Sequence, residues 1–134
     1  MGVRIGCGLS TDPDPHRAAR AAGRDAAAAL GGDADLALVF ASGAHLAAPL
    51  DLLESVHDTV GASAISGCGA GGVVGGPHEI EGGTAVAVWA ADLAGGVART
   101  FHADVDERED GLALAGMPDP VGADGLLLFP DPYS

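Results

Sequence analysis

Three short apolar segments that alternate with two helical patterns constrain the fold of this chain more than any other feature. Residues 3–9 alternate apolar with small or polar residues, as strands do, whereas residues 36–41 are continuously apolar. The segment Asp12-Pro13-Asp14-Pro15 supplies an N-cap carboxylate and a proline for the start of the first helix, and Gly61 marks the end of the second. The segments run strand, helix, strand, helix and strand, at residues 3–9, 15–30, 36–41, 49–60 and 62–66. Because the connections are this short, the order predicts two parallel βαβ units with right-handed crossovers.

A different pattern follows the third strand. Residues 84–91 and 97–103 are both strand-like, and the short segment between them has the spacing of a hairpin. We expect the acidic residues 104–110 to form a solvated turn, residues 111–125 a loop and residues 126–129 a buried strand. The predicted fold class is therefore α/β, with a βαβαβ parallel unit followed by an antiparallel hairpin extension.

The glycine-rich stretch SGCGAGGVVGG, residues 66–76, raises the question of a phosphate site. It has G-x-G-x-x-G spacing at Gly67, Gly69 and Gly72, directly after an apolar segment. In a dinucleotide site these glycines open a helix of about three turns. The further glycines and Pro77 leave no room for such a helix, and the chain has no lysine for a Walker-type loop. The sequence therefore argues against a nucleotide site.

The same glycines can serve a different kind of site. In parallel α/β sheets, ligands bind beyond the carboxyl ends of the strands. Three loops are predicted to converge there, at residues 8–11, 42–45 and 66–72. Backbone N–H groups in a glycine turn can form a concave nest for a carboxylate. The predicted ligand-binding residues are Ser10, Ser42, His45, Gly67, Cys68, Gly69, Gly71 and Gly72.

Charge and composition exclude several partners. The chain of 134 residues is long enough for one sizeable core, and its six arginines face 19 acidic residues, for a net charge of −13. Such a field repels phosphate backbones and anionic lipid, so we expect no nucleic-acid and no membrane partner. The N-terminus has no apolar segment of signal-peptide length. We therefore expect a cytoplasmic protein with Cys7 and Cys68 as free thiols.

Two other chemistries and one structural role stay open. Cys68 could act as a nucleophile with His45 as its base, which would make the chain a Cys-His enzyme. Cys7, His45, Cys68 and His78 have no metal-site spacing, so we expect neither a metal nor another cofactor. A structural or interaction module without a ligand is the third reading. The aromatic residues expected to anchor the core are Trp89 and Phe101.

The succession LVFASGAH, an amphipathic helix and then AISGCGAGGVVGGPHEIEGGTAVAVWAADL resembles the FIST N domain, the sensory module of FIST signal-transduction proteins. The resemblance runs from about Val3 to Ser134, and its most specific part is the GCGAGGV turn with the EIEGG block that precedes a strand. It implies a small-molecule sensor with amino acids as suggested ligands, often joined to signalling modules. It implies no catalytic residues, so we expect a binding protein and not an enzyme.

The resemblance also bears on domain organisation. We expect residues 1–134 to form a single FIST N-like domain that is incomplete at its C-terminus, because Ser134 would N-cap a helix that does not follow and the FIST C domain is missing. The expected partners are a small-molecule ligand and that missing FIST C or signalling domain. Apolar surface left at residues 126–129 predicts self-association into a homo-oligomer.

Overall fold

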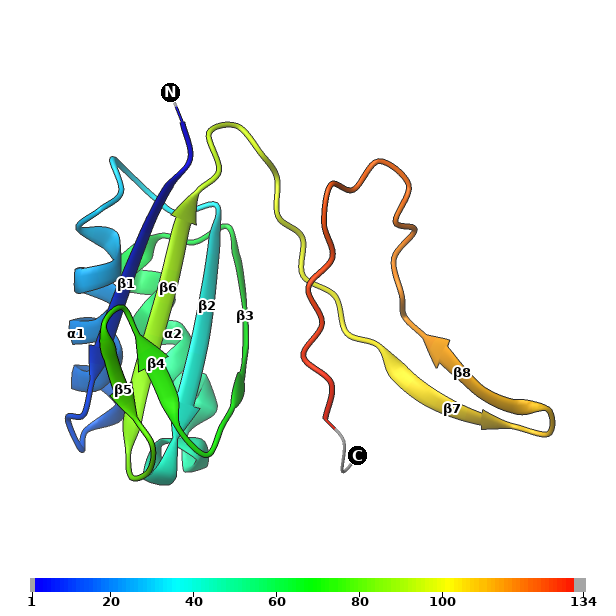
Figure 1. Ribbon diagram of the computed structural model, residues 1–134, viewed down its shortest axis with the longest axis horizontal. Coiled ribbons are helices and arrows are strands. Elements are labelled where there is room, and N and C mark those ends of the chain that lie inside the picture. The colour runs from blue at the N-terminus through cyan, green and yellow to red at the C-terminus, as the bar shows by residue number, and fades with distance from the viewer. Residues whose placement is uncertain (1, 132–134) are drawn as a thin grey trace. The chain divides into compact units, whose positions relative to one another are not determined.

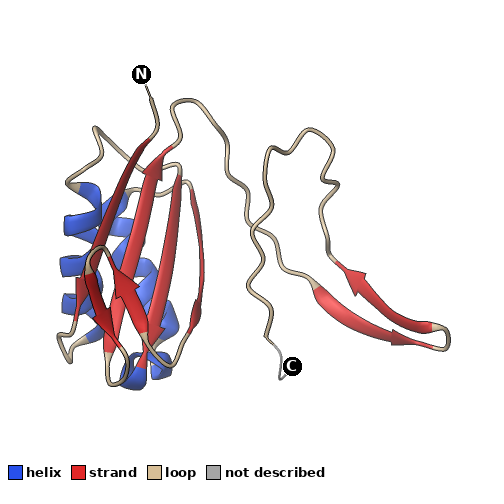
Figure 2. Ribbon diagram, viewed as in Figure 1, coloured by secondary structure: helices blue, strands red, loops and turns tan. Residues whose placement is uncertain are grey.

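The computed structural model describes residues 2–131, which separate into two compact units, one ending at Ala98 and the other beginning at Arg99. In the first unit, two α-helices cover one face of a four-stranded sheet and a short hairpin lies on the other face (Figures 1 and 2). A short 3₁₀ helix, Gly43–Ala47, precedes the second α-helix. The elements of this unit are β1 (Arg4–Ser10), α1 (Pro15–Ala27), β2 (Leu36–Ser42), α2 (Pro49–Val60), β3 (Ala64–Gly69), β4 (Val73–Gly75), β5 (His78–Ile80) and β6 (Ala85–Asp92).

The sheet has the strand order β1-β6-β2-β3. β2 and β3 pair in parallel, and β6 runs antiparallel to both β1 and β2. The α/β class and the common direction of the first three strands are therefore confirmed. The pairing differs from the expectation in one respect, since β6 enters the middle of the sheet and is not a lateral extension. The reason is its composition, because a strand that is apolar on both faces is best buried between two neighbours.

Close packing between α1 and β1 depends on small residues on both elements. Ala18, Ala22 and Ala26 of α1 are fully buried. On β1, a Cβ atom at Gly6 would collide with the Ala26 carbonyl group, and one at Gly8 with the Ala22 carbonyl group. The helix backbone therefore rests directly on the strand backbone, as the smooth alanine face permits.

The helix ends follow the local signals in the sequence. The Asp14 side chain caps α1 by accepting a hydrogen bond from the Arg17 N–H at 2.8 Å, and Pro15 occupies the first helical position. Gly61 ends α2 in the left-handed conformation, with φ of 62°. These caps orient the loops that lead into and out of the sheet.

The segment between β3 and β6 contains the β4–β5 hairpin and no helix, as the glycine-rich sequence predicted. The expected hairpin between residues 84–91 and 97–103 is wrong, because residues 97–103 form no strand. The first of these strands pairs instead with β1 and β2, whose apolar edges offer it more burial than a two-stranded ribbon would. Trp89 and Phe101 are both partly exposed, so neither is the buried anchor we expected.

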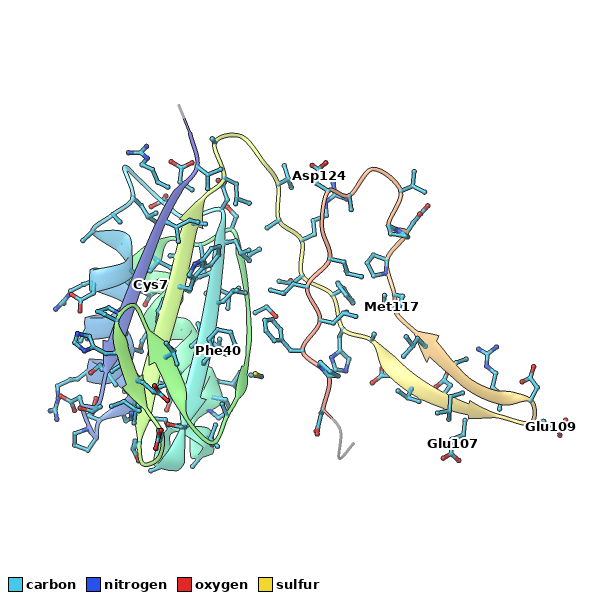
Figure 3. The ribbon with its side chains drawn as sticks, viewed as in Figure 1. Cys7, Phe40, Glu107, Glu109, Met117 and Asp124 are labelled. Carbon is cyan, nitrogen blue, oxygen red and sulfur yellow. The ribbon has the colours of Figure 1, made fainter. Side chains whose placement is uncertain are left out.

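The second unit is a hairpin with irregular flanking segments. Its strands are β7 (Asp104–Arg108) and β8 (Gly111–Ala115), paired antiparallel. The acidic segment expected to be a turn is therefore mostly a strand, which carries Glu107, whereas Glu109 lies in the turn between β7 and β8 (Figure 3). Residues 126–129 form no strand, and Leu126, Leu127 and Leu128 are exposed. Self-association through them stays a prediction, and Ser134, the expected N-cap, lies outside the described residues.

Candidate functional site

The carboxyl ends of β1, β2 and β3 bring the predicted loops together at one edge of the sheet. The His45 ring donates from Nε2 to the Asp12 carbonyl oxygen at 2.9 Å, which joins the loop after β2 to the loop after β1. The Ser42 hydroxyl donates to the Gly83 carbonyl oxygen at 2.8 Å. The Thr84 hydroxyl oxygen accepts from the Ala44 N–H at 3.0 Å. Side chains from two chain segments, near Ser42 and at Thr84, thus tie three segments together at this edge.

Three of the predicted ligand-binding side chains contact the protein's own backbone. Ser42 and His45 are 0% and 1% exposed, and their hydrogen bonds point into the protein. The Ser10 hydroxyl oxygen accepts from the Asp12 N–H at 3.2 Å. These side chains hold the loops in place, and the exposed residues at this edge include Cys68, Gly69 and Gly71 of the glycine turn, residues 66–72.

The glycines of the turn differ in what surrounds them. A Cβ atom at Gly67 would collide with the Val39 carbonyl group, and one at Gly72 would lie 2.6 Å from the Ile80 carbonyl oxygen. A Cβ at Gly69 would lie 2.8 Å from a methyl carbon of Leu46, which a flexible side chain can relieve. Gly71 is exposed and has no neighbour within 4 Å of the same position. The turn therefore packs tightly at both ends and is open at Gly71.

Cys68 and His45 are not brought together as a catalytic pair. Cys68 is exposed on β3 and faces the same side of the sheet as Phe40, its register partner on β2. His45 is buried against Asp12, and residues 2–131 contain no hydrogen bond between the two side chains. Within the same residues, no three His, Cys, Asp or Glu side chains lie close enough to hold a metal ion.

Asp12 is the most strongly paired carboxylate near this edge. The Arg17 guanidinium donates from Nε to Oδ2 and from Nη2 to Oδ1, both at 3.1 Å, and the Asp14 N–H donates to Oδ1 at 2.8 Å. The hydrogen bonds from Arg17 and then from Asp14 lower the pKa of Asp12 below its ordinary value. The loop that receives the His45 bond is thereby fixed to the start of α1.

We expect Arg17→Ala to make the unfolding stability less sensitive to acid. A carboxylate with a lowered folded-state pKa contributes stability that is present above its unfolded pKa, and that stability is lost as the pH falls through the folded pKa. The loss therefore falls below the ordinary aspartate value of 3.8. Urea unfolding of the parent and the variant across the acid range measures it, and the two curves should converge at the acid end.

Arg20→Ala is the matched control, since Arg20 is exposed on the same helix. It should leave the acid dependence unchanged. Asp92 also contributes to the acid dependence of stability, because the Ala94 N–H donates to its carboxylate and lowers its pKa. Both variants keep this contribution. Parallel curves for Arg17→Ala and the parent would show that the Asp12 pair adds nothing to stability.

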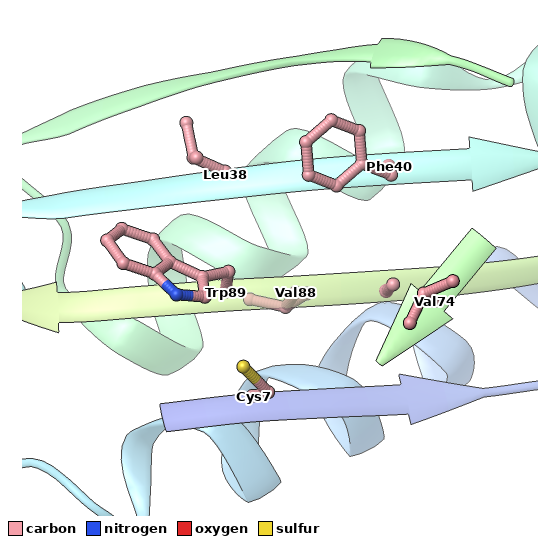
Figure 4. A pocket seen from close by; sticks show the side chains of 7 residues that line it. Cys7, Leu38, Phe40, Val74, Val88 and Trp89 are labelled. Carbon is pink, nitrogen blue, oxygen red and sulfur yellow. The ribbon is translucent and has the colours of Figure 1, made fainter. Parts of the chain in front are cut away.

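The sheet face opposite the two helices carries a hollow that sequence reasoning missed. Its volume is about 210 Å³. The side chains around it come from β1, β2, β4 and β6 (Figure 4). A bulky Trp89 between the small residues Ala87 and Ala91, in a strand-like segment, is the sequence signal that could have indicated it. The lining residues are Cys7, Leu38, Phe40, Val74, Ala87, Val88 and Trp89.

Comparison with known families agrees with the fold and the glycine turn. The model of the FIST N domain matches residues 35–134, which begin just before β2 and include the glycine turn. This chain therefore belongs to the FIST N domain family, a family of sensory domains in signal transduction.

Similar proteins are found in mycobacteria. An uncharacterized protein of Mycobacterium tuberculosis strain H37Rv is 43% identical over 134 residues, which are 98% of this chain and 34% of that protein. An uncharacterized protein of Mycobacterium bovis is 39% identical over the same shares of the two chains. The chain thus spans about a third of the length of these relatives. No solved structure gives a significant match. Among the described residues, neither helix has the length and apolar character needed to cross a lipid bilayer.

Proposed function

We propose that this chain is a ligand-binding sensory domain whose glycine turn recognises a small carboxylate, such as an amino acid. The observation that carries the proposal is the convergence of the loops after β1 and β2 beside the exposed glycine turn that follows β3, which the His45–Asp12 and Ala70–Ala41 hydrogen bonds join. Ligands of parallel α/β sheets bind at this edge. Membership of a sensory family agrees with binding as the function.

The chemistry of the turn suits a carboxylate. Among loop hydrogen bonds, the Ala70 N–H donates to the Ala41 carbonyl oxygen at 2.9 Å, whereas Gly71 donates no such bond within the described residues. Backbone N–H groups are fixed local donors, so they can hold an anion even on a chain of net charge −13. In this proposal Ser10, Ser42 and His45 hold the loops, and Cys68 forms part of the wall.

The proposal also includes the cellular compartment of the domain and the domain that receives its signal. It places the sensor in the cytoplasm, where Cys7 and Cys68, both free thiols, stay reduced. It assigns the output to a FIST C or other signalling domain. The relatives, whose other two thirds lie outside the match, have room for such a domain.

A thermal-shift screen with the twenty amino acids tests the binding. A ligand that binds only the folded state raises the melting temperature, and the rise keeps growing with ligand concentration above the dissociation constant. We expect at least one amino acid to raise it in a concentration-dependent way. If no amino acid does so at millimolar concentration, the proposed ligand class is wrong.

We expect Gly71→Val to abolish that shift while the unliganded melting temperature stays close to the parent's. The valine side chain enters open space, so the fold tolerates it, but it covers the backbone that the carboxylate approaches. Cys68→Ser is the matched control in the same turn and should keep the shift, since the proposal gives the thiolate no role. An enzymatic activity that Cys68→Ser eliminates would replace the binding proposal with the Cys-His alternative.

A further inference from the structure

The hollow on the sheet face opposite the helices has none of residues 66–72 in its lining, and its chemistry differs from that of the glycine turn. We propose that it binds one small, uncharged, planar ring compound that carries a hydrogen-bond acceptor. This inference goes beyond the proposed function, because it concerns another surface and an apolar ligand. It rests on the register of the strands, the charge of the lining and the size of the hollow.

Strand register builds the hollow from side chains that point to one side. Cys7 on β1, Trp89 on β6 and Leu38 on β2 form one row across the sheet. Ala87 and Phe40 are register partners in the next row. Because side chains alternate faces along a strand, both rows face away from the helices. Trp89 and Phe40 therefore form two aromatic walls of the hollow, as Figure 4 shows from close by.

Small residues create the space and a hairpin supplies its rim. Ala87 is buried at the floor, where any larger side chain would fill the hollow. Gly75 lets the β4–β5 hairpin approach β1, since a Cβ atom there would lie 2.6 Å from the Leu9 Cβ. Val74 of this hairpin is 64% exposed and lines the opening.

The lining indicates an uncharged ligand. The lining contains no Asp, Glu, Lys, Arg or His side chain, on a chain whose net charge is −13. A carboxylate placed there would lose its hydration without gaining a cation. The indole nitrogen of Trp89 lies on the side of Cys7 in Figure 4, and residues 2–131 offer it no hydrogen-bond acceptor. A ligand with one acceptor atom would satisfy this donor.

The size of the hollow selects a small molecule over larger partners. An apolar cavity of about 150 Å³ binds benzene. At about 210 Å³, this hollow accommodates a molecule of one or two fused rings. A second copy of the chain seated on this face would form a dimer, which sedimentation equilibrium detects.

The test uses the single tryptophan of the chain as a reporter. The neutral dye 7-methoxycoumarin, which has two fused rings and a carbonyl acceptor, should quench Trp89 and show saturable sensitised emission, because energy transfer requires the dye to lie close to the indole. Quinoline, which is planar, uncharged and has an acceptor nitrogen, should displace the dye. Naphthalene, which lacks the acceptor, and quinoline-4-carboxylate, which is charged, should each displace it at least about tenfold more weakly.

Paired variants locate the dye. Val74→Lys places a charge at the rim opposite Glu79, its partner across the hairpin, and should weaken dye binding at least about tenfold. Leu50→Lys adds the same charge at a residue that is 70% exposed on α2 and should leave binding unchanged. Gly71→Val should also leave it unchanged, which separates this site from the glycine turn. Melting curves confirm that each variant is folded.

Thiol reactivity gives a second readout. In Cys68→Ser, where Cys7 is the remaining thiol, quinoline should slow the reaction with a thiol reagent. In Cys7→Ser, the reactivity of Cys68, which does not line the hollow, should not change. The proposal is overturned if energy transfer does not saturate, or if both lysine variants bind the dye equally. It is also overturned if Cys7 is protected without quinoline and sedimentation equilibrium shows a dimer. This face would then be an interface between copies of the chain.

Discussion

Replacing Gly8 by valine is expected to lower the free energy of unfolding by at least about 3 kcal/mol. A Cβ atom at this position would collide with the backbone carbonyl group of Ala22 in α1. A backbone carbonyl cannot rotate away as a side chain does, so the helix must move off the sheet. That movement also loosens Ala18 and Ala26, which are fully buried in the main core. Urea unfolding monitored by circular dichroism measures the loss.

Gly32→Val is the matched control for Gly8→Val. A Cβ atom at Gly32 meets nothing within 4 Å, so the same substitution should change stability by less than about 1 kcal/mol. If Gly8→Val were as stable as Gly32→Val, the close contact between α1 and β1 would not exist in solution. A small domain has only about 5–15 kcal/mol of stability, so Gly8→Val also tests how far the first unit depends on this contact.

The second large effect is expected for His45→Ala, which should cost about 2 to 4 kcal/mol of unfolding free energy. The imidazole is 1% exposed, so its removal leaves a cavity. It also removes the donor that pairs with the Asp12 carbonyl oxygen. Thermal or urea unfolding at neutral pH measures the change.

His57→Ala is the matched control, because the His57 side chain is 63% exposed on α2. Its stability should stay within about 0.5 kcal/mol of the parent. The contrary result would be a His45→Ala variant that melts like the parent but whose melting temperature no amino acid raises. That result would make His45 a ligand contact. The two outcomes thus separate a residue that holds a loop from a residue that touches a ligand.

The site residues show where sequence reasoning stops. Their convergence could be predicted, because parallel strands place their carboxyl ends at one edge. The direction of each side chain could not be predicted. A serine or histidine after a strand has the same local sequence whether it points to solvent or to the backbone of another loop. The burial of Ser42 and His45 comes from Gly83 and Asp12, which are distant in the sequence. The hollow at Trp89 was missed for a related reason, since its walls belong to four strands.

The sequence by itself determined the local elements. Alternating and continuous apolar segments defined β1, β2 and β3, and Asp14 and Gly61 marked helix ends that the structure confirms. These signals act within a few residues, where backbone conformation and capping decide the outcome.

Only the tertiary structure decided the neighbours of β6. This strand follows β3 in the chain, yet it pairs with β1 and β2 and separates them. Its sequence shows that both faces are apolar, but any central position in a sheet would bury such a strand. The choice depends on which edges of the other strands remain free once α1 and α2 have packed. That competition between distant segments has no signature in any local stretch of the chain.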